Sequence, residues 1–200
     1  MKTIPRALCA FALGSLLAAP AMGQGSKPRG LEELPSPEPE GTYTFSVEGR
    51  PLDSIADLGL TGSPIDVDVH AWRFQVKGPA LKKPLSLTYD ELAAMPRVSR
   101  VSLLICPGFF EDVAEWGGVP IAGLLALADA SPSWKEIEVT SVDGYPVRFT
   151  REEVNTHVVF VALTVNGQVL PKEHGFPARL VAEGIFGGRW VKWISSIEVN

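Results

Sequence analysis

The sequence predicts an α+β fold in which mixed β-sheets dominate and the helices are short. Three observations favour this class. Runs with strand character recur along the chain, helix-start signals precede only short segments, and few strand–helix–strand crossovers are visible. Of the 200 residues, 46% are hydrophobic, which suits one domain with a sizeable core.

Seven stretches have the residue pattern of β-strands, either through alternation of apolar and polar residues or through a short continuous apolar run. The Asp143-Gly144 pair predicts a hairpin between two of them, and Asn166-Gly167 predicts a tight turn after another. The seven stretches span residues 42–49, 71–78, 101–105, 135–141, 145–149, 158–165 and 194–199.

The predicted helices are short and begin with recognisable caps. Thr88 followed by Glu91 forms a capping box, and Met95-Pro96 ends that helix after little more than one turn. Thr150 and Glu153 offer a second capping box. Residues 120–130 begin with a proline, have an apolar face and predict a further helix.

The N-terminus has the organisation of a secretory signal peptide. Lys2 and Arg6 form a basic region before an apolar stretch over residues 7–17, which is too short to cross a bilayer. Ala21 and Gly23 are small residues suited to cleavage before residue 24. We therefore predict a signal peptide over 1–23, a flexible Pro-, Gly- and Glu-rich linker over 24–41, and the folded domain over 42–200.

Composition excludes some classes of partner. Removal of Lys2 and Arg6 with the leader changes the formal charge from −5 to −7, and an acidic chain with scattered charges argues against nucleic acid as a partner. No other segment of the sequence is long and apolar enough to span a membrane. We expect an exported protein, periplasmic or secreted, whose mature chain has no membrane span.

Cys106 is the only cysteine outside the leader. It follows the apolar run 101–105 and precedes Pro107-Gly108, so the thiol is predicted to lie where a buried strand gives way to a loop. A single thiol has no intramolecular disulfide partner, which leaves packing, metal ligation or reactivity as its role. Three acidic residues are expected in the following loop, where they would repel anionic substrates such as sulfite: Glu111, Asp112 and Glu115.

An ordered set of motifs resembles a known family. The set resembles the molybdopterin-binding domain of the sulfite oxidase superfamily, in particular the bacterial exported branch that includes the catalytic subunit of the periplasmic protein methionine-sulfoxide reductase. The resemblance covers roughly residues 70 to 199. Its motifs are Cys106, Trp116, Gly118-Val119-Pro120, Val165-Asn166-Gly167 with Leu170-Pro171, His174-Gly175-Phe176-Pro177-Ala178-Arg179-Leu180-Val181, Phe186-Gly187 and Val191-Lys192-Trp193-Ile194.

The resemblance implies a sulfite-oxidase-type fold, a molybdenum–molybdopterin cofactor and a role for each matching residue. Cys106 matches the thiolate that binds molybdenum, a sensible ligand because soft thiolates suit redox metals. The implied cofactor contacts are Ser141, His174, Arg179, Trp190, Val191 and Lys192. A pyranopterin carries a phosphate, and cationic side chains of Arg179, Arg189 and Lys192 would suit it.

The resemblance further implies an oxidoreductase that transfers an oxygen atom to or from a small-molecule substrate at a Cys-ligated molybdenum. The sequence contains no Cys-x-x-Cys-His for covalent haem, so electrons would come from a separate haem- or quinone-linked partner.

Two alternatives remain open at the level of sequence. The leader lacks the Arg pair of the twin-arginine signal through which members of the family leave the cell folded, which favours a metal-free binding or accessory protein on the same fold. A thiol enzyme is a further hypothesis, with Cys106 as nucleophile and His70, His157 or His174 as the base.

Overall fold

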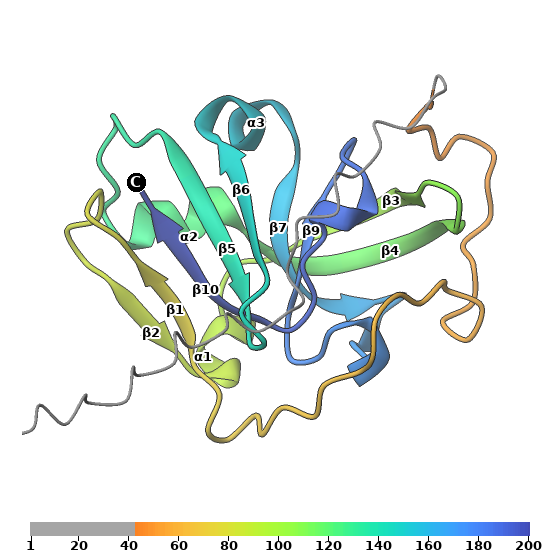
Figure 1. Ribbon diagram of the computed structural model, residues 1–200, viewed down its shortest axis with the longest axis horizontal. Coiled ribbons are helices and arrows are strands. Elements are labelled where there is room, and N and C mark those ends of the chain that lie inside the picture. The colour runs from red at the N-terminus through yellow and green to blue at the C-terminus, as the bar shows by residue number, and fades with distance from the viewer. Residues whose placement is uncertain (1–42) are drawn as a thin grey trace, which may run out of the picture. The chain divides into compact units, whose positions relative to one another are not determined.

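Two β-sheets carry the fold of residues 43–200, which are the residues that the computed structural model describes (Figure 1). The first sheet has the order β2-β1-β10-β5-β6. Its strands are β1 (Phe74–Lys77), β2 (Leu85–Leu87), β5 (Glu136–Ser141), β6 (Pro146–Thr150) and β10 (Ile194–Val199). The predicted signal peptide and linker lie outside the described residues and stay predictions.

The second sheet has the order β3-β4-β7-β8, and a further strand, β9, also pairs with β7. Its strands are β3 (Val98–Cys106), β4 (Phe110–Pro120), β7 (Val159–Val165), β8 (Gln168–Val169) and β9 (Arg179–Ala182). All these pairings are antiparallel, whereas β1 and β10 of the first sheet pair in parallel. The first sheet is therefore mixed and the second is antiparallel, and with the short helices they confirm the predicted α+β fold class.

The helices are short, as predicted. They are α1 (Tyr89–Ala93), α2 (Ile121–Leu127), α3 (Arg151–Thr156) and two 3₁₀ turns, η1 (Lys172–His174) and η2 (Gly187–Arg189). Both predicted capping boxes are confirmed, because each cap threonine accepts from the N3 backbone and the N3 glutamate accepts from the cap backbone. No helix within residues 43–200 is long and apolar enough to cross a membrane.

One large apolar core joins the two sheets. The first sheet contributes side chains such as Phe74 and Phe149, and the second contributes Trp116, Phe160 and others that are similarly inaccessible to solvent. Burial of one such aromatic side chain stabilises the fold by about 2 to 3 kcal/mol. The core fixes the positions of the strand ends that carry the polar groups described below.

Three predicted elements differ from the structure. Residues 43–47 form no strand; their alternation arises because Tyr43, Phe45 and Val47 pack on a small apolar cluster of Leu103, Ile105 and Val113. The helix predicted over 120–130 ends at Leu127, and Asp129 two residues later has a left-handed φ of 51°.

The third correction concerns the acidic residues that follow Cys106. The predicted loop is in fact the start of β4, which pairs with β3 through the tight turn Pro107-Gly108-Phe109. Gly108 has φ 79°, a left-handed conformation that glycine adopts without strain.

Candidate functional site

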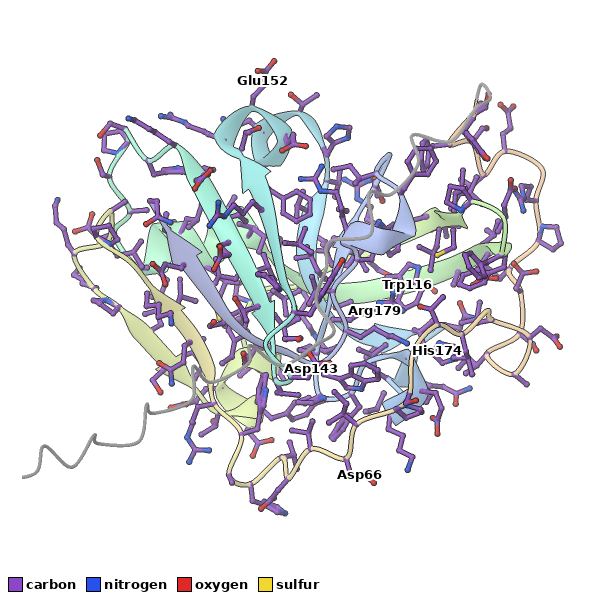
Figure 2. The ribbon with its side chains drawn as sticks, in the orientation of Figure 1. Asp66, Trp116, Asp143, Glu152, His174 and Arg179 are labelled. Atoms are coloured by element: carbon purple, nitrogen blue, oxygen red, sulfur yellow. The ribbon has the colours of Figure 1, made fainter. Side chains whose placement is uncertain are left out.

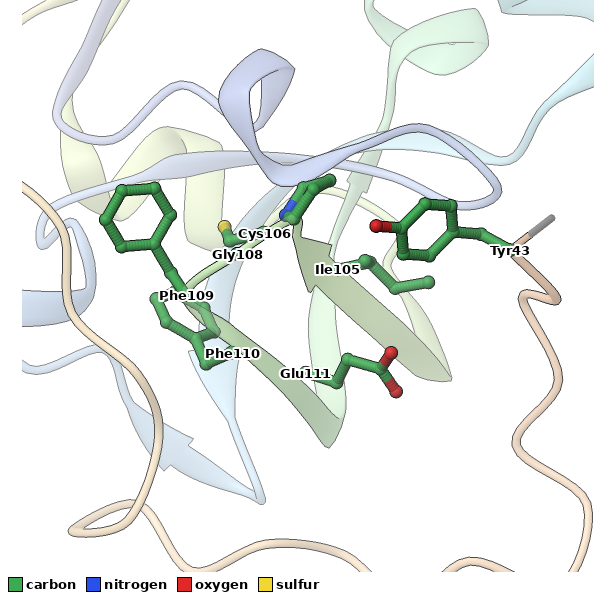
Figure 3. Close-up of a pocket in the computed structure, with 8 residues that line it drawn as sticks. Tyr43, Ile105, Cys106, Gly108, Phe109, Phe110 and Glu111 are labelled. Carbon is green, nitrogen blue, oxygen red and sulfur yellow. The ribbon is translucent and has the colours of Figure 1, made fainter. Parts of the chain in front are cut away.

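Cys106 is the last residue of β3, at the tip of the β3–β4 hairpin (Figure 3). Its carbonyl accepts a hydrogen bond from Phe109 N at 2.9 Å, which closes the turn. The thiol is half-buried and borders a pocket of about 260 Å³. The lining of this pocket comes from Tyr43, Ile105, Cys106, Pro107, Gly108, Phe109, Phe110 and Glu111.

The pleat of the hairpin decides which side chains share the face of Cys106. Residues Leu104 and Cys106 pair with Asp112 and Phe110 of β4, so these four side chains lie on one face of the ribbon. Ile105 lies on the opposite face, with Tyr43 beside it (Figure 3). The face of Cys106 continues along β4 to Trp116, which is 1% exposed.

Gly187 of η2 lies directly against the sulfur. A Cβ atom added to this glycine would be 2.4 Å from Cys106 Sγ and 2.6 Å from Leu104 Cδ1. Such distances are far below ordinary contact, so a methyl group at this position would force the sulfur and the Leu104 side chain to shift. The match of Phe186-Gly187 to the family motif therefore has a steric reason in this structure.

Arg179 is the first residue of β9 and is 5% exposed (Figure 2). Its guanidinium carbon lies 4.6 Å from the centre of the Trp116 ring and 5.8 Å from that of Trp190. Nη1 donates to the His174 carbonyl at 3.3 Å, while the buried Nε has no hydrogen-bond partner among the described residues. Burial lowers the pKa of Arg179 to about 10, and the charges of Cys106 and Asp112 oppose this shift only in part.

Lys192 supplies a second cation from the segment before β10. Its Nζ donates to the carbonyls of Thr61 at 2.6 Å and Glu173 at 3.1 Å. Burial first, and then the charge of Arg179, lowers the pKa of Lys192 to about 8, while Cys106 acts in the opposite direction. Both hydrogen-bond partners are neutral carbonyls, and Nζ also lies 4.7 Å from the centre of the Trp193 ring, so no carboxylate is among these contacts of Lys192.

The Cys106 thiol responds to both cations. Burial raises the pKa of the Cys106 thiol above its ordinary value; Arg179 and Lys192 lower it, and Asp112 raises it further. Burial prevails, so the metal-free thiol is protonated at neutral pH. A bound metal would hold it as the thiolate, because metal ligation displaces the proton.

His174 ends η1 and is 5% exposed. Burial lowers the pKa of His174, and the charge of Arg179 lowers it further, whereas a hydrogen bond with the Ile55 backbone opposes the shift. The next residue, Gly175, has φ 112°, and a Cβ atom there would be 2.9 Å from Arg179 Cβ and 3.2 Å from Lys192 Cβ. This turn therefore lets the two cationic residues approach each other.

Trp190 and Val191 are core residues next to the cations. Trp190 is 3% exposed, donates from Nε1 to the Ile185 carbonyl at 2.9 Å, and lies edge-on to Trp116. The Val191 carbonyl accepts from Leu180 N at 2.7 Å. These contacts hold the segment that carries Lys192 against β9. Cofactor contacts of Trp190 and Val191 stay predictions.

Ser141 lies at the end of β5, in the turn to β6. Its hydroxyl accepts from Tyr145 N at 3.0 Å and donates to the Asp143 carboxylate, as expected of a serine that stabilises a turn. The family role of Ser141 toward the cofactor likewise stays a prediction.

Arg189 differs from the expectation that it is available to a phosphate. Its guanidinium donates to both carboxylate oxygens of Glu153, at 2.5 and 3.2 Å, and lies over the Phe149 ring at 4.1 Å. The same pairing lowers the pKa of Glu153 to about 2. Arg189 is thus committed to a structural ion pair.

The acidic residues of β4 surround Cys106 only in part, since Glu111 lines the pocket beside the thiol and Asp112 shares its face, whereas Glu115 lies farther along the strand. Glu111 pairs with Arg50 at 3.2 Å, and Glu115 accepts from Ser99 Oγ at 2.5 Å. Only Asp112 shares the face of Cys106; it is 5% exposed and accepts from Gly59 N at 2.9 Å. Burial raises the pKa of Asp112, and the Gly59 hydrogen bond lowers it.

The histidines do not support a Cys–His thiol enzyme. His70 is exposed, and the His157 ring lies beside Gly184. Within residues 43–200, no histidine forms a hydrogen bond with the Cys106 thiol. No general base is therefore in place to activate this sulfur.

The site suits an anionic, metal-containing cofactor. The described residues contain no group of three or more His, Cys, Asp or Glu side chains able to hold a metal by themselves. A metal at Cys106 would therefore need ligands beyond the His, Cys, Asp and Glu side chains of residues 43–200, and an organic cofactor is one source of them. The buried Arg179, its unpartnered Nε and the half-buried Lys192 provide the charge and donors that an anion requires.

Comparison with known proteins supports a molybdopterin-binding site. The family described as oxidoreductase molybdopterin binding domain matches residues 61–200. The putative protein-methionine-sulfoxide reductase subunit YedZ1 of Azospira oryzae is 29% identical, over 82% of this chain and 56% of that protein. Human mitochondrial sulfite oxidase is 27% identical, over 78% of this chain and 36% of that protein.

Among solved structures, the sulfane dehydrogenase SoxCD from Paracoccus pantotrophus is similar, with a TM-score of 0.63 and 28% identity over 68% of this chain and 40% of that chain. The chain thus spans only part of the length of these relatives. The family match covers well over half of the chain, and the fold agrees with it. The chain therefore belongs to the oxidoreductase molybdopterin-binding domain family of the sulfite oxidase superfamily, whose cofactor is molybdenum–molybdopterin.

Proposed function

We propose that this chain is an exported oxidoreductase in which Cys106 Sγ ligates the molybdenum of a molybdopterin cofactor. The observation that carries the proposal is the charge balance around the thiol. Arg179 is buried, pairs with no carboxylate among the described residues and leaves its Nε without a partner. Such a charge is costly to bury, and a bound anion offsets the cost.

The residues of the chain have distinct tasks in this proposal. Cys106 holds the metal as a thiolate, and Arg179 and Lys192 neutralise the anionic parts of the cofactor. His174, Ser141, Trp190 and Val191 retain the cofactor-contacting roles implied by the family motifs. When bound, the cofactor supplies two-electron redox chemistry with transfer of an oxygen atom.

The substrate and the electron source belong to the same proposal. Asp112 shares the face of Cys106 and Glu111 lines the pocket beside it, whereas the positive charges of Arg179 and Lys192 lower the pKa of the thiol. The site therefore does not repel anions in the way the sequence suggested, and a small-molecule substrate is proposed without restriction to neutral compounds. A separate haem- or quinone-linked protein would exchange electrons with the cofactor.

The experiment is the molybdenum content of purified protein, measured by mass spectrometry on wild type, Cys106→Ser and Val101→Ser. Val101 lies on the same strand and is 44% exposed, so its variant controls for substitution in β3. We expect one molybdenum per chain in wild type and Val101→Ser, and a background level in Cys106→Ser with an unchanged circular dichroism spectrum.

Two results would contradict the proposal. Stoichiometric molybdenum in Cys106→Ser would remove the residue from the metal site. Wild type without molybdenum, from cells that make the cofactor, would instead favour a metal-free binding protein. Export is tested separately by N-terminal sequencing of the mature protein, which we expect to begin at Gln24.

A further inference from the structure

The η2 turn places the backbone of Gly187 against the sulfur of Cys106. The three nearest neighbours of a Cβ atom placed on Gly187 are Cys106 Sγ, Leu104 Cδ1 and the Ile105 carbonyl, at 2.4, 2.6 and 3.2 Å. These atoms belong to the last three residues of β3, next to the hairpin turn. One side of the sulfur is thus covered by main chain that leaves no room for a methyl group.

The C-terminal side of the turn is fastened to other elements. Arg189 pairs with Glu153 at 2.5 Å and lies over the Phe149 ring at 4.1 Å, which ties it to α3 and β6. The Tyr145 hydroxyl donates to the Gly188 carbonyl at 3.2 Å. The turn therefore has contacts with two elements that do not belong to the β3–β4 hairpin.

The N-terminal side is fastened by aromatic packing. The ring of Phe186 lies edge-on to Tyr43 at 5.1 Å and next to Phe45 at 5.4 Å. Trp190, directly after the turn, is 3% exposed and donates to the Ile185 carbonyl. Because both flanks are held, a side chain added at Gly187 would displace the sulfur rather than the turn.

The neighbouring glycine provides a natural contrast. A Cβ atom on Gly188 would have no heavy atom within 4 Å. Neither Gly187 nor Gly188 has a positive φ, so alanine is compatible with the backbone conformation at both positions. The two positions differ in what the methyl group would meet.

We propose that η2 is a fixed back wall for the Cys106 thiol and that Gly187 is a positioning residue, which sets the direction from which a metal reaches the sulfur. Because Gly187 has no side chain, the sulfur of Cys106 can lie directly against η2. The Arg189–Glu153 pair holds η2 in this position. Away from this wall, the thiol borders the pocket at the hairpin tip, and the charges of Arg179 and Lys192 act on it. The part of this inference that concerns metal rests on the proposed function.

The test compares wild type, Gly187→Ala and Gly188→Ala through two readouts. The first is molybdenum per chain in protein from cofactor-producing cells. The second is the rate of alkylation of Cys106 by iodoacetamide in metal-free protein, which requires no cofactor. We expect Gly187→Ala to lose at least tenfold in molybdenum and at least fivefold in alkylation rate, with Gly188→Ala within twofold of wild type in both.

A rescue variant separates positioning from general damage. Glu153→Gln removes the negative charge that holds Arg189 and so loosens η2. The double variant Gly187→Ala/Glu153→Gln should therefore let η2 move away from the sulfur and recover at least threefold in molybdenum content. Should Gly187→Ala fail to fold, Glu153→Gln alone tests the wall, with at least threefold faster alkylation expected than in wild type.

The outcomes distinguish this inference from the proposed function. Wild type without molybdenum would refute the proposed function, while the alkylation rates would still decide the role of Gly187. Equal alkylation rates in Gly187→Ala and Gly188→Ala would overturn the back-wall assignment. If Gly187→Ala does not fold, an alkylation rate in Glu153→Gln equal to that of wild type would overturn it.

Discussion

Arg179 and Arg189 are ten residues apart and belong to opposite kinds of environment. Arg189 is about one-third exposed and donates to both carboxylate oxygens of Glu153. Arg179 is 5% exposed, has no carboxylate partner in residues 43–200 and leaves its Nε unpaired. The first arginine is balanced within the protein, and the second is not.

The difference indicates a structural role for Arg189 and a functional role for Arg179. A paired, partly exposed arginine contributes modestly to stability. A buried, unpaired guanidinium costs several kcal/mol to desolvate, although stacking on Trp116 and the His174 carbonyl recover part of this. Such a charge indicates a site that is complete only when an anion is bound.

The largest expected effect is a difference in cofactor content between substitutions of the two arginines. Arg179→Met should weaken retention of the cofactor by at least about 100-fold, or about 3 kcal/mol, because it removes the only fully buried cation of the site. Arg189→Met should retain molybdenum to within about threefold. Molybdenum per chain after extensive dialysis measures both, and equal losses in the two variants would refute the distinction.

The Arg189–Glu153 pair should matter for stability rather than for cofactor content. Glu153→Gln removes the partner of Arg189 and weakens the capping box of α3 at Thr150, so we expect the free energy of unfolding to fall by about 1 to 2 kcal/mol. Chemical denaturation of the metal-free protein measures this. As a control, Glu152→Gln changes an exposed neighbour on the same helix, and a loss as large as that of Glu153→Gln would contradict this role of the Arg189–Glu153 pair.

The same ion pair should make the free energy of unfolding depend on pH in the acid range. The hydrogen bonds from Arg189 lower the pKa of Glu153 from 4.5 to about 2. Since the folded-state pKa is the lower one, the stabilisation is fully present above about pH 4.5 and is lost as the pH falls toward about 2. Unfolding curves recorded across this window should have a smaller slope with pH in Glu153→Gln than in wild type, and identical slopes would contradict the assignment.

Asp112 should have the smallest effect. Burial raises the pKa of Asp112, so its ionised form is slightly unfavourable in the folded state above that pKa. Asp112→Asn keeps an oxygen for Gly59 N and should change the free energy of unfolding at pH 7 by less than about 1 kcal/mol, in the stabilising direction. A loss of more than about 2 kcal/mol would show that the carboxylate is a structural anchor.

Local patterns predicted the fold well where one short segment contained the whole signal. The threonine–glutamate capping boxes that begin α1 and α3 need only four residues each, and the apolar run before Pro107-Gly108 placed Cys106 at the end of β3. Alternation was less decisive. In residues 43–47 it reflects packing on the face of a sheet, and after Cys106 a charged strand resembles a loop.

The site was harder to predict because its meaning depends on distant partners. Arg179 and Arg189 are equivalent in sequence until the structure shows Glu153, 36 residues away, against one of them. Gly187 gave no signal of its own beyond a motif match, because its importance lies in the sulfur that it contacts. Motif order indicated the family; three-dimensional contacts were needed to assign the charges.

The most direct test is the stability difference between wild type and Arg179→Met, measured by chemical denaturation with and without bound cofactor. We predict that the order inverts: the variant is at least as stable as wild type in the metal-free state, because an uncompensated buried charge is removed, and less stable when both proteins are loaded. A variant that is less stable by the same amount in both states would show that Arg179 is structural, and would contradict the account of this site as an anion-binding cofactor centre.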